Sequence, residues 1–506
     1  MENSWANLGR DLHLDLAGPG GVRAGLMRAL RDAVRTGRLA PGTRLPSSRS
    51  LAADLGIARN TVADAYGELV AEGWLSARQG SGTRVAGDHL ARTARGRGGR
   101  APSRTAALPP AAAPSRTAPP ARRTASPHVP DRPRHNLMPG SPDVSSFPRA
   151  AWLASARRAL TAAPSEAFGY GAPNGRPELR AVLADYLARA RGVWADPDRI
   201  VICAGFMQAL GLVGRALRGS GIRAMGVESY GLDFHRDVLT RAGLRLAPLS
   251  IDAQGARTGE LTGPAAAVGG SSVRAVLLTP AHQFPTGVPL HPDRRAAVVD
   301  WARSVDGVIL EDDYDGEFRY DRQPVGALQG LDPERVVYMG TASKSLAPGL
   351  RLSWMVLPDR LVDPVLALKG TGEWQTGSLD QLTLAEFISS GAYDRHVRGM
   401  RLRYRRRRDQ LVAALAEHAP HLTVSGIAAG LHAVLELPPG SERSIVQAAR
   451  WQGLALEGLS QFAHPQMPAG TTPRDALVLA YGAPADHSFA GALDALLRVL
   501  PDAPEE

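Results

Sequence analysis

The chain contains only two lysines, Lys344 and Lys369, among 59 basic residues. A lysine amine can lose its proton and attack a carbonyl carbon, which an arginine guanidinium cannot do. Lys344 lies in the stretch GTASKSLAPGLRL, directly after an apolar run that is typical of a strand. The sequence therefore predicts that Lys344 forms a Schiff base with an aldehyde.

Other residues in this region could bind the rest of an aldehyde cofactor. Asp312 follows the apolar run GVIL, and a buried carboxylate needs a partner, such as a protonated pyridine nitrogen or a nearby arginine. Gly205 and Phe206 open a predicted helix, whose N-terminus favours phosphate. Further phosphate donors are Thr341, Ser343 and Arg351. Aldehyde capture, pyridinium pairing and phosphate binding together describe pyridoxal 5'-phosphate. No metal site is predicted.

Alternating strands and helices position these residues. Strand-like runs occupy 199–203, 224–228, 275–280, 307–314, 336–340 and 352–358, and helical patterns such as 206–218 and 292–304 lie between them. This order predicts an α/β domain with a mostly parallel sheet. Ligands of such sheets bind beyond the carboxyl ends of the strands, where Gly205, Asp312, Tyr314 and Lys344 fall.

The first ninety residues predict a winged helix. Apolar residues at helical spacing over 22–37 are followed by a capped short helix in SRSLAADLG and a third helix from Arg59. A three-residue turn joins the last two helices, as in a helix-turn-helix. Two β-like runs around Gly80 then form a hairpin, the wing.

The start of the third helix carries residue types that read base edges. Arg59 can contact guanine, Asn60 can contact adenine, and Thr61 follows them. Arg49, at the start of the second helix, is placed for a phosphate, and Gly80 lies in the wing turn. These residues predict binding to double-stranded DNA.

The net charge of +10 is concentrated in one segment. Residues 91–134 contain ten arginines and one acid, and they are rich in Ala, Pro and Ser. Such a segment cannot bury enough apolar surface to fold, so we expect a disordered linker, which either only connects the domains or also contacts DNA phosphates. A second arginine run, between residues 401 and 408, fits either a solvated helix face or a second DNA-contacting patch.

Composition excludes several classes of protein. The 506 residues suffice for two or three domains, and the single cysteine, Cys203, excludes an internal disulfide. The N-terminus lacks the features of a secretory signal, and no run of about 18 apolar residues is present. We therefore expect a soluble, cytoplasmic protein without a membrane partner.

Two parts of the chain resemble known families. The stretch PGTRLPSSRSLAADLGIARNTVADAYGELVAEGWLSARQGSGTRV resembles the winged-helix domain of GntR-type regulators. The blocks FGYGAPNGRPELR, TPAHQFPTGV, ILEDDYDGEFRY and GTASKSLAPGLRL resemble the fold-type I aminotransferase domain of MocR/GabR-type regulators. This second resemblance implies Lys344 as the Schiff-base lysine, Asp312 on the pyridine nitrogen, Tyr314 on the phenolate oxygen and Arg351 on the phosphate. It also implies a homodimer in which Tyr170 reaches the partner's phosphate.

The chain departs from the family pattern around the cofactor ring. Leu232 stands where an aromatic residue often stacks on the ring, and Tyr230 or Phe234 could substitute. Phe284 stands where aminotransferases have an asparagine near the ring oxygen, and His282 or Gln283 could take over that contact.

The chain also lacks the arginines that hold a substrate carboxylate in relatives. Val478 occupies the late-strand position of the aminotransferase arginine, and Phe234 replaces a second arginine of some amino-acid-sensing relatives. Arg474 could compensate. Without these cations we expect very slow transamination of common amino acids.

The predicted organisation is a GntR-type winged helix over 1–88, a linker over 89–134 and an aminotransferase-like domain over 135–506. We expect a transcription regulator that binds a DNA operator and senses pyridoxal phosphate, or an adduct of it, as its small-molecule effector. Two alternatives are an active aminotransferase with an accessory DNA-binding domain, and a DNA-binding module whose large domain only dimerises.

Overall fold

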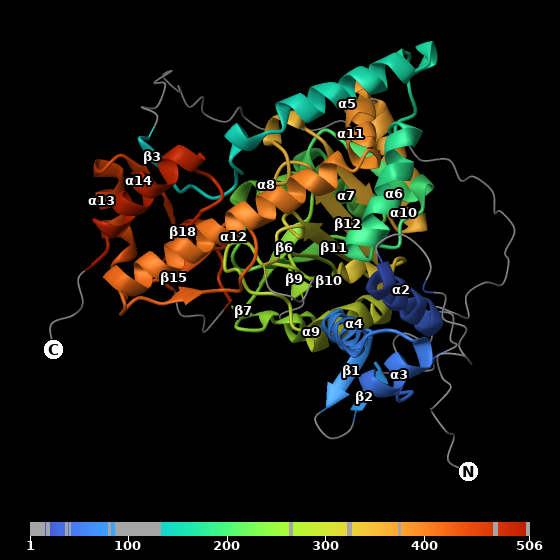
Figure 1. Cartoon of the computed structure of the whole chain (residues 1–506), viewed down its shortest axis with the longest axis horizontal. Coiled ribbons are helices and arrows are strands. Elements are labelled where there is room, and N and C mark those ends of the chain that lie inside the picture. Colours follow the sequence, from blue (N-terminus) through green and yellow to red (C-terminus); the bar gives the residue numbers. More distant parts are fainter. Residues whose placement is uncertain are drawn as a thin grey trace, which may run out of the picture.

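The computed structural model describes residues 16, 21–35, 39, 42–78, 82–86, 133–262, 267–320, 326–372, 376–468 and 474–501. A small N-terminal domain, a large α/β domain and a C-terminal domain follow one another along the chain (Figure 1). The predicted linker 89–134 lies outside the described residues except for its last two. In the described part of the chain, no helix is long and apolar enough to span a membrane.

The N-terminal domain is a winged helix, as the sequence predicts. Its elements are α2 (Gly21–Arg35), α3 (Ser48–Leu55), α4 (Arg59–Ala71) and the antiparallel strands β1 (Leu75–Arg78) and β2 (Gly82–Val85). The side chain of Ser47 caps α3 by accepting the Ser50 N–H at 3.1 Å. Gly56 ends α3 with φ of 66°, a left-handed conformation that glycine adopts without strain, and so permits the tight turn into α4.

The large domain is built on a mostly parallel sheet in the order β4-β13-β12-β11-β10-β5-β6, in which only β13 runs antiparallel to its neighbours. Its strands are β4 (Ile200–Cys203), β5 (Ala224–Glu228), β6 (Arg245–Leu249), β10 (Ser271–Leu278), β11 (Val308–Asp313), β12 (Val336–Thr341) and β13 (Ser353–Val356). β9 (Ala267–Val268) pairs with β10. The prediction of an α/β fold with a mostly parallel sheet is confirmed, and the edge strand β6 is an addition to it.

Helices cover both faces of this sheet, which makes three layers (Figure 1). One face packs against α7 (Phe206–Gly219), α8 (Asp233–Arg241) and α10 (Asp359–Gly372). The other packs against α6 (Pro177–Arg191), α9 (Pro292–Ser304) and α11 (Ser378–Ser389), and α5 (Arg149–Ala162) lies on α11. Because both faces are buried, strands such as β4, β11 and β12 are buried along their whole length.

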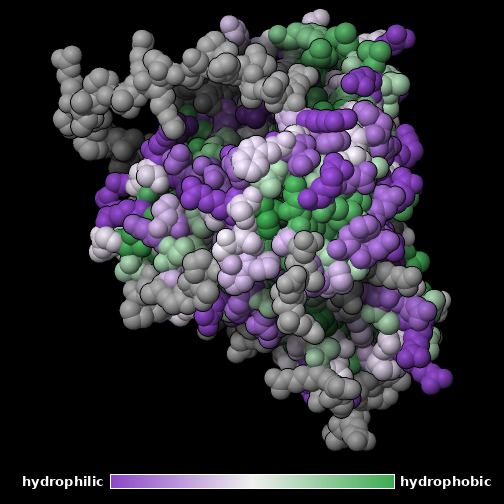
Figure 2. Space-filling model, turned by 90° about the vertical axis from the view of Figure 1, so that its left-hand side faces the viewer, coloured by the Kyte–Doolittle hydropathy of each residue, from purple (hydrophilic) through white to green (hydrophobic). Residues whose placement is uncertain are grey.

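The long helix α12 (Ala392–His418) leads from the large domain to the C-terminal domain (Figure 1). That domain contains an antiparallel sheet of β14 (Val424–Ser425), β15 (Ala433–Glu436), β18 (Ala476–Leu479) and β17 (Glu457–Gly458), with α13 (Glu442–Trp451) and α14 (Asp486–Leu497). β3 (His135–Asn136) pairs with β16 (Leu454–Ala455), so residues from both ends of the 135–506 region meet here. Figure 2 shows the side of the molecule that lies at the left in Figure 1. Hydrophilic side chains cover most of this side, around an apolar area at its centre.

The winged helix packs against the large domain beside α9 (Figure 1). Its apolar core and that of the adjacent sheet face form one cluster, in which Trp74 is buried. Gly73 lies so close to Leu331 that a Cβ there would be 3.6 Å from a leucine methyl group. Nearby, Glu72 is buried and accepts two hydrogen bonds from Arg31, at 2.6 and 2.9 Å.

The arginine run of α12 is partly structural. Arg407 is only 2% exposed, and its Nη2 contacts Asp143 Oδ2 at 3.1 Å and Asp486 Oδ1 at 2.6 Å. Its Nη1 donates to the Pro484 carbonyl at 2.8 Å. Arg405, in contrast, is exposed, and among the described residues its ion-pair partner is Asp409, at 3.9 Å. Arg407 therefore ties the C-terminal domain to the loop before α5.

We expect Arg407→Ala to destabilise the protein strongly, because the buried Asp143 carboxylate loses its bonded cation and keeps only the more distant Arg403, at 3.8 Å. Breaking a buried ion pair in this way costs about 3–5 kcal/mol. Thermal unfolding followed by circular dichroism measures the loss. Arg405→Ala is the control and should leave the transition nearly unchanged. Equal behaviour of the two variants would contradict this assignment.

Candidate pyridoxal phosphate and DNA sites

A cavity opens at the carboxyl ends of strands β5, β10, β11 and β12 and is closed on one side by the C-terminal domain. Side chains from both domains line it. Of the residues singled out in the sequence, the lining includes Phe206, Asp312, Tyr314, Thr341, Ser343, Lys344 and Arg351. The structure thus brings together residues separated by up to 145 positions, at the edge of the sheet where the sequence predicts them.

One end of the cavity has the features of a phosphate site. Arg351 Nη2 donates to the Ala204 carbonyl at 2.7 Å, which holds the guanidinium over the N-terminus of α7. Gly205 precedes that helix with φ of 93°, and a Cβ on it would come within 2.7 Å of the guanidinium carbon. Only a glycine leaves this space, where a cation and free helix N–H groups face the same point.

Thr341 and Ser343 lie at the same end of the cavity. Thr341 Oγ1 donates to Ser343 Oγ at 2.9 Å and accepts the Ser343 N–H at 3.1 Å. The two hydroxyl groups are therefore held together at the end of β12, next to Lys344.

Asp312 and Lys344 form the centre of the cavity. Asp312 is 6% exposed, its Oδ1 has no hydrogen-bond partner among the described residues, and burial raises its pKa well above the usual value. Burial also lowers the pKa of Lys344, while Asp312 and Asp315 raise it. A buried carboxylate oxygen without a partner is what a protonated ring nitrogen would stabilise. A lowered pKa favours the neutral amine, which is the form that attacks an aldehyde.

The second lysine has a structural role. Lys369 is fully buried in α10, and its Nζ donates to the Pro173 carbonyl at 2.6 Å. It is absent from the cavity lining, so Lys344 is the lysine that reaches the cavity.

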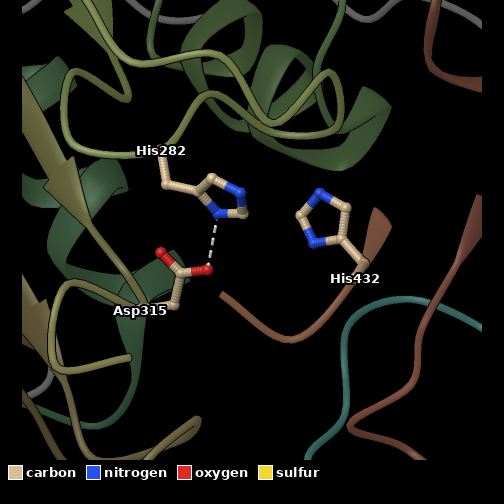
Figure 3. A group of neighbouring side chains, drawn as sticks. All are labelled: His282, Asp315 and His432. Atoms are coloured by element: carbon tan, nitrogen blue, oxygen red, sulfur yellow. Dashed lines mark hydrogen bonds and ion pairs between the residues drawn. The ribbon is translucent and has the colours of Figure 1, made fainter. Parts of the chain in front are cut away.

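Tyr314 belongs to a hydrogen-bonded group behind the cavity. Its hydroxyl lies 3.0 Å from the carbonyl oxygen of His282 and 3.1 Å from His282 Nδ1. The same Nδ1 lies 2.9 Å from Asp315 Oδ2, the contact drawn in Figure 3. Since Asp315 is buried, an Nδ1–H that donates to its carboxylate is the favoured tautomer. His282 and Asp315 thereby orient Tyr314.

His432 faces His282 across this group, with the ring centres 5.0 Å apart (Figure 3). Its Nε2 bonds to the Pro285 carbonyl at 3.0 Å, and burial lowers its pKa to about 3, so the ring is neutral. One atom each of His282, Asp315 and His432 lies within 4.8 Å of the others, and all three are residue types that bind metals. The sequence predicted no metal site and did not single out this cluster.

Phe284 replaces the asparagine that aminotransferases have near the ring oxygen, and His282 and Gln283 were the two candidates to take over its contact. Neither of them lines the cavity. Gln283 is 1% exposed, and its amide bonds to Glu228, Tyr230 and Phe284 through Nε2 and to Thr286 through Oε1. His282 contacts Tyr314 instead. Phe284 itself lines the cavity and packs edge-on to Tyr314, at 6.0 Å between ring centres.

The two aromatic residues that could stack on the ring, Tyr230 and Phe234, differ in burial. Tyr230 is 4% exposed and belongs to an apolar cluster with Phe284 and Val478, and Leu232 packs against that cluster. Phe234 is 45% exposed at the cavity wall. His235 packs against Phe206, with ring centres 4.7 Å apart.

Tyr170 lies outside this cavity. Its side chain is fully exposed and lines a shallow surface depression with Phe168 and Leu379. Within one chain it therefore contributes nothing to the cavity.

The residues expected to bind DNA lie on the winged helix. Arg49 and Arg59 are exposed at the starts of α3 and α4, Asn60 is exposed and Thr61 is half-buried. Gly80 lies outside the described residues. Asn60 also lines a cleft between α4 and the large domain, so the reading end of α4 partly faces that domain.

The polar and charged cavity residues that the sequence did not single out include Glu228, His235, Arg236 and His432. Glu228 accepts from Thr279 Oγ1 at 2.6 Å, and burial raises its pKa to about 7. His235, Arg236 and His432 line the cavity from α8 and the C-terminal domain. Glu228 could have been noticed because it ends a predicted strand, whereas the other three required the tertiary structure.

Comparison with known proteins assigns both parts of the chain. Residues 23–85 match the bacterial regulatory proteins of the gntR family, and residues 137–468 match aminotransferase class I and II. The probable rhizopine catabolism regulatory protein MocR of Rhizobium meliloti is 35% identical, over 90% of this chain and 89% of that protein. The chain belongs to the MocR/GabR-type regulators of the GntR family.

Other relatives agree with this assignment. The pyridoxine biosynthesis transcriptional regulator PdxR of Corynebacterium glutamicum is 32% identical, over 88% of this chain and 89% of that protein. The fold of an archaeal alanine:glyoxylate aminotransferase matches 72% of this chain and 90% of that chain, with a TM-score of 0.63 and 24% identity. This MocR-type regulator thus combines a DNA-binding winged helix with an aminotransferase-like domain whose cofactor is pyridoxal 5'-phosphate.

We expect Gly205→Ala to weaken cofactor binding at least tenfold, because its Cβ would displace the Arg351 guanidinium and because φ of 93° strains an alanine. Titration of apo-protein with pyridoxal phosphate, followed by visible absorbance, measures the affinity. Gly219→Ala at the end of the same helix is the control, since a Cβ there meets nothing within 4 Å. Unchanged cofactor affinity in Gly205→Ala would show that the phosphate binds elsewhere.

Proposed function

We propose that the aminotransferase-like domain of this regulator serves as a sensor of pyridoxal phosphate, or of an adduct of it, and that its ligand state controls DNA binding. The observation that carries this proposal is the joint presence of an intact cofactor cavity and of a winged helix packed on the same domain. When bound, the cofactor supplies an aldehyde that combines with primary amines and an electron-poor ring.

The residues predicted from the sequence each have a proposed part in holding the cofactor. Lys344 would hold the cofactor through its amine, and the Asp312 carboxylate would pair with the ring nitrogen. Tyr314, positioned by His282 and Asp315, would donate its hydroxyl hydrogen to the ring oxygen in place of the His282 carbonyl. Arg351 binds the phosphate together with Thr341, Ser343 and the helix N-terminus at Gly205 and Phe206.

A sensor is favoured over an enzyme by the absence of the usual substrate clamp. Val478 is fully buried in β18, within an apolar cluster, at the place of the aminotransferase arginine. Arg474, the candidate replacement, pairs with Glu436 and does not line the cavity. Phe234 brings no charge to the second position. The alternative, an active aminotransferase with an accessory DNA-binding domain, requires a different clamp.

We also propose a homodimer formed through the aminotransferase-like domain. Exposed apolar side chains gather on α5 and near Tyr170, including Leu153, Leu160, Phe168 and Leu379. Burial of this surface against a second copy would bring Tyr170 to a cavity other than its own. The family resemblance, in which such a tyrosine reaches the partner's phosphate, supports this arrangement.

The proposed division of the chain is 1–88 for DNA binding, 89–134 for the linker and 135–506 for the sensor. Forty-six residues reach up to about 3.3 Å each when extended, so the linker permits the winged helices of a dimer to engage separated half-sites.

Cofactor titration tests the proposed function. Pyridoxal phosphate added to apo-protein should change operator affinity, and borohydride should trap the cofactor on the Lys344 peptide and not on the Lys369 peptide. Lys344→Ala should lose both the trapped cofactor and the response. DNA binding that is indifferent to the cofactor, or transamination at about 1 s⁻¹ or faster, would contradict the sensor role.

Binding to duplex DNA tests the assignment of α3 and α4. Arg59→Ala should weaken operator binding by roughly 1–3 kcal/mol and relax sequence preference, because it removes a base contact. Arg49→Ala should weaken all sequences alike and lower the salt slope by about 1. Fluorescence anisotropy at several salt concentrations distinguishes the two. If Arg59→Ala kept the affinity and preference of the parent protein, another surface would read the bases.

A further inference from the structure

The cavity contains a guanidinium that binding of pyridoxal phosphate leaves unused. Two arginines line the described part of the cavity, Arg351 and Arg236. Arg351 lies over the N-terminus of α7, at the proposed phosphate site. Arg236 lies on α8, next to His235, on the wall that continues from Tyr230 to Leu232.

Arg236 is held in place by backbone carbonyl groups. Its Nη1 donates to Gly231 O at 2.9 Å and to Phe462 O at 3.2 Å, and its Nη2 donates to Ala463 O at 3.3 Å. These bonds use three of the five N–H donors of a guanidinium. The Nε–H and one Nη2–H have no bond within the described part of the chain.

Arg236 forms no salt bridge with an acid in the part of the chain that the structure describes. The nearest acids on its own helix, Asp233 and Asp237, are both exposed. Burial lowers the pKa of Arg236, which these two carboxylates oppose. A partly desolvated, rigidly held cation with two spare donors is unfavourable by itself and is stabilised by a bound anion.

The surroundings indicate the kind of anion. Tyr230, Leu232, Phe234 and Phe284 make the nearby wall largely apolar, and His235 adds no charge because burial, with Lys344 and Arg236, lowers its pKa to about 3. Lys344, His235 and Arg236 line the same cavity, and both cations are near enough to lower the pKa of His235. A ligand at Arg236 therefore extends toward the amine that holds the cofactor.

We propose that Arg236 is the anion receptor of the sensor, and that the ligand recognised beside the cofactor is a small organic carboxylate with an apolar body. This rests on the proposed sensor function and specifies its ligand. Arg236 lies on α8, whereas the aminotransferase arginine would lie on β18, at the position of Val478. The proposed carboxylate site is therefore on a different wall of the cavity from the usual substrate site.

Calorimetry on the full-length, cofactor-loaded protein tests this with straight-chain carboxylates from acetate to hexanoate and their amides as probes. A carboxylate should bind at least tenfold more tightly than the amide of equal length. Arg236→Gln should weaken carboxylate binding about 10- to 100-fold, to the level of the amide, with amide binding unchanged. Arg241→Gln, exposed at the end of the same helix, should behave like the parent protein.

Arg236 also bonds to carbonyl groups of the C-terminal domain, so Arg236→Gln could act by disturbing the domain contact. Arg236→Lys, which retains a cation, is therefore a second variant. It should keep a reduced preference for carboxylate over amide. Equal binding of carboxylates and amides by the parent protein, or an unchanged preference in Arg236→Gln, overturns the proposal. Visible absorbance and DNA affinity, measured separately on each variant, show whether the cofactor and its response remain, so failure of the sensor function is distinguishable from failure of this receptor.

Discussion

Burial of three consecutive acids in strand β11 is the constraint on which the rest of the structure depends. Glu311, Asp312 and Asp313 are all less than 7% exposed in the middle of the sheet. Carboxylates in such a place are costly unless cations or N–H donors compensate them. Because side chains alternate along a strand, Asp312 points to one face and its two neighbours to the other. Each face therefore needs its own set of partners.

The face opposite the cavity is compensated by arginines and backbone N–H groups. Asp313 accepts two hydrogen bonds from Arg191, at 2.7 and 2.9 Å, and one from Tyr338 at 2.8 Å. Glu311 accepts the N–H groups of Leu328 and Gln329, yet burial raises its pKa to about 7. The protein satisfies these acids with long-range contacts, which explains how a sheet interior tolerates them.

This charged layer lies directly beneath the winged helix. Arg295, fully buried, donates to the Gly326 carbonyl at 2.7 Å and interacts electrostatically with both Glu311 and Glu72. Its Nε and Nη1 have no hydrogen-bond partner among the described residues. Glu72 follows α4, the helix that carries Arg59 and Asn60. One strand thus lines the cofactor cavity with Asp312 and, through Glu311, interacts with the buried Arg295, which also interacts with Glu72 of the winged helix.

The sequence by itself determined the local features of both sites. Lys344, Asp312 and Gly205 could be recognised because each follows a strand-like run, and Arg351 because it lies seven residues beyond Lys344. The winged helix followed from helical periodicity, a serine cap at position 47 or 48 and the Gly56 turn, all of which act within a few residues. Short-range interactions of this kind depend only on neighbouring residues.

Only the tertiary structure decided which side chains meet across the chain. Arg236 faces the cavity because it bonds to carbonyls 226 residues away, Arg407 is buried by the fold of the C-terminal domain, and Tyr170 lies outside the cavity of its own chain. The sequence showed that Val478 replaces the aminotransferase arginine, but it could not show that Arg236 lines another wall of the same cavity. Pairing between distant segments results from the packing of whole layers, because a side chain's partner depends on which surfaces that packing brings together and not on the residues beside it in sequence.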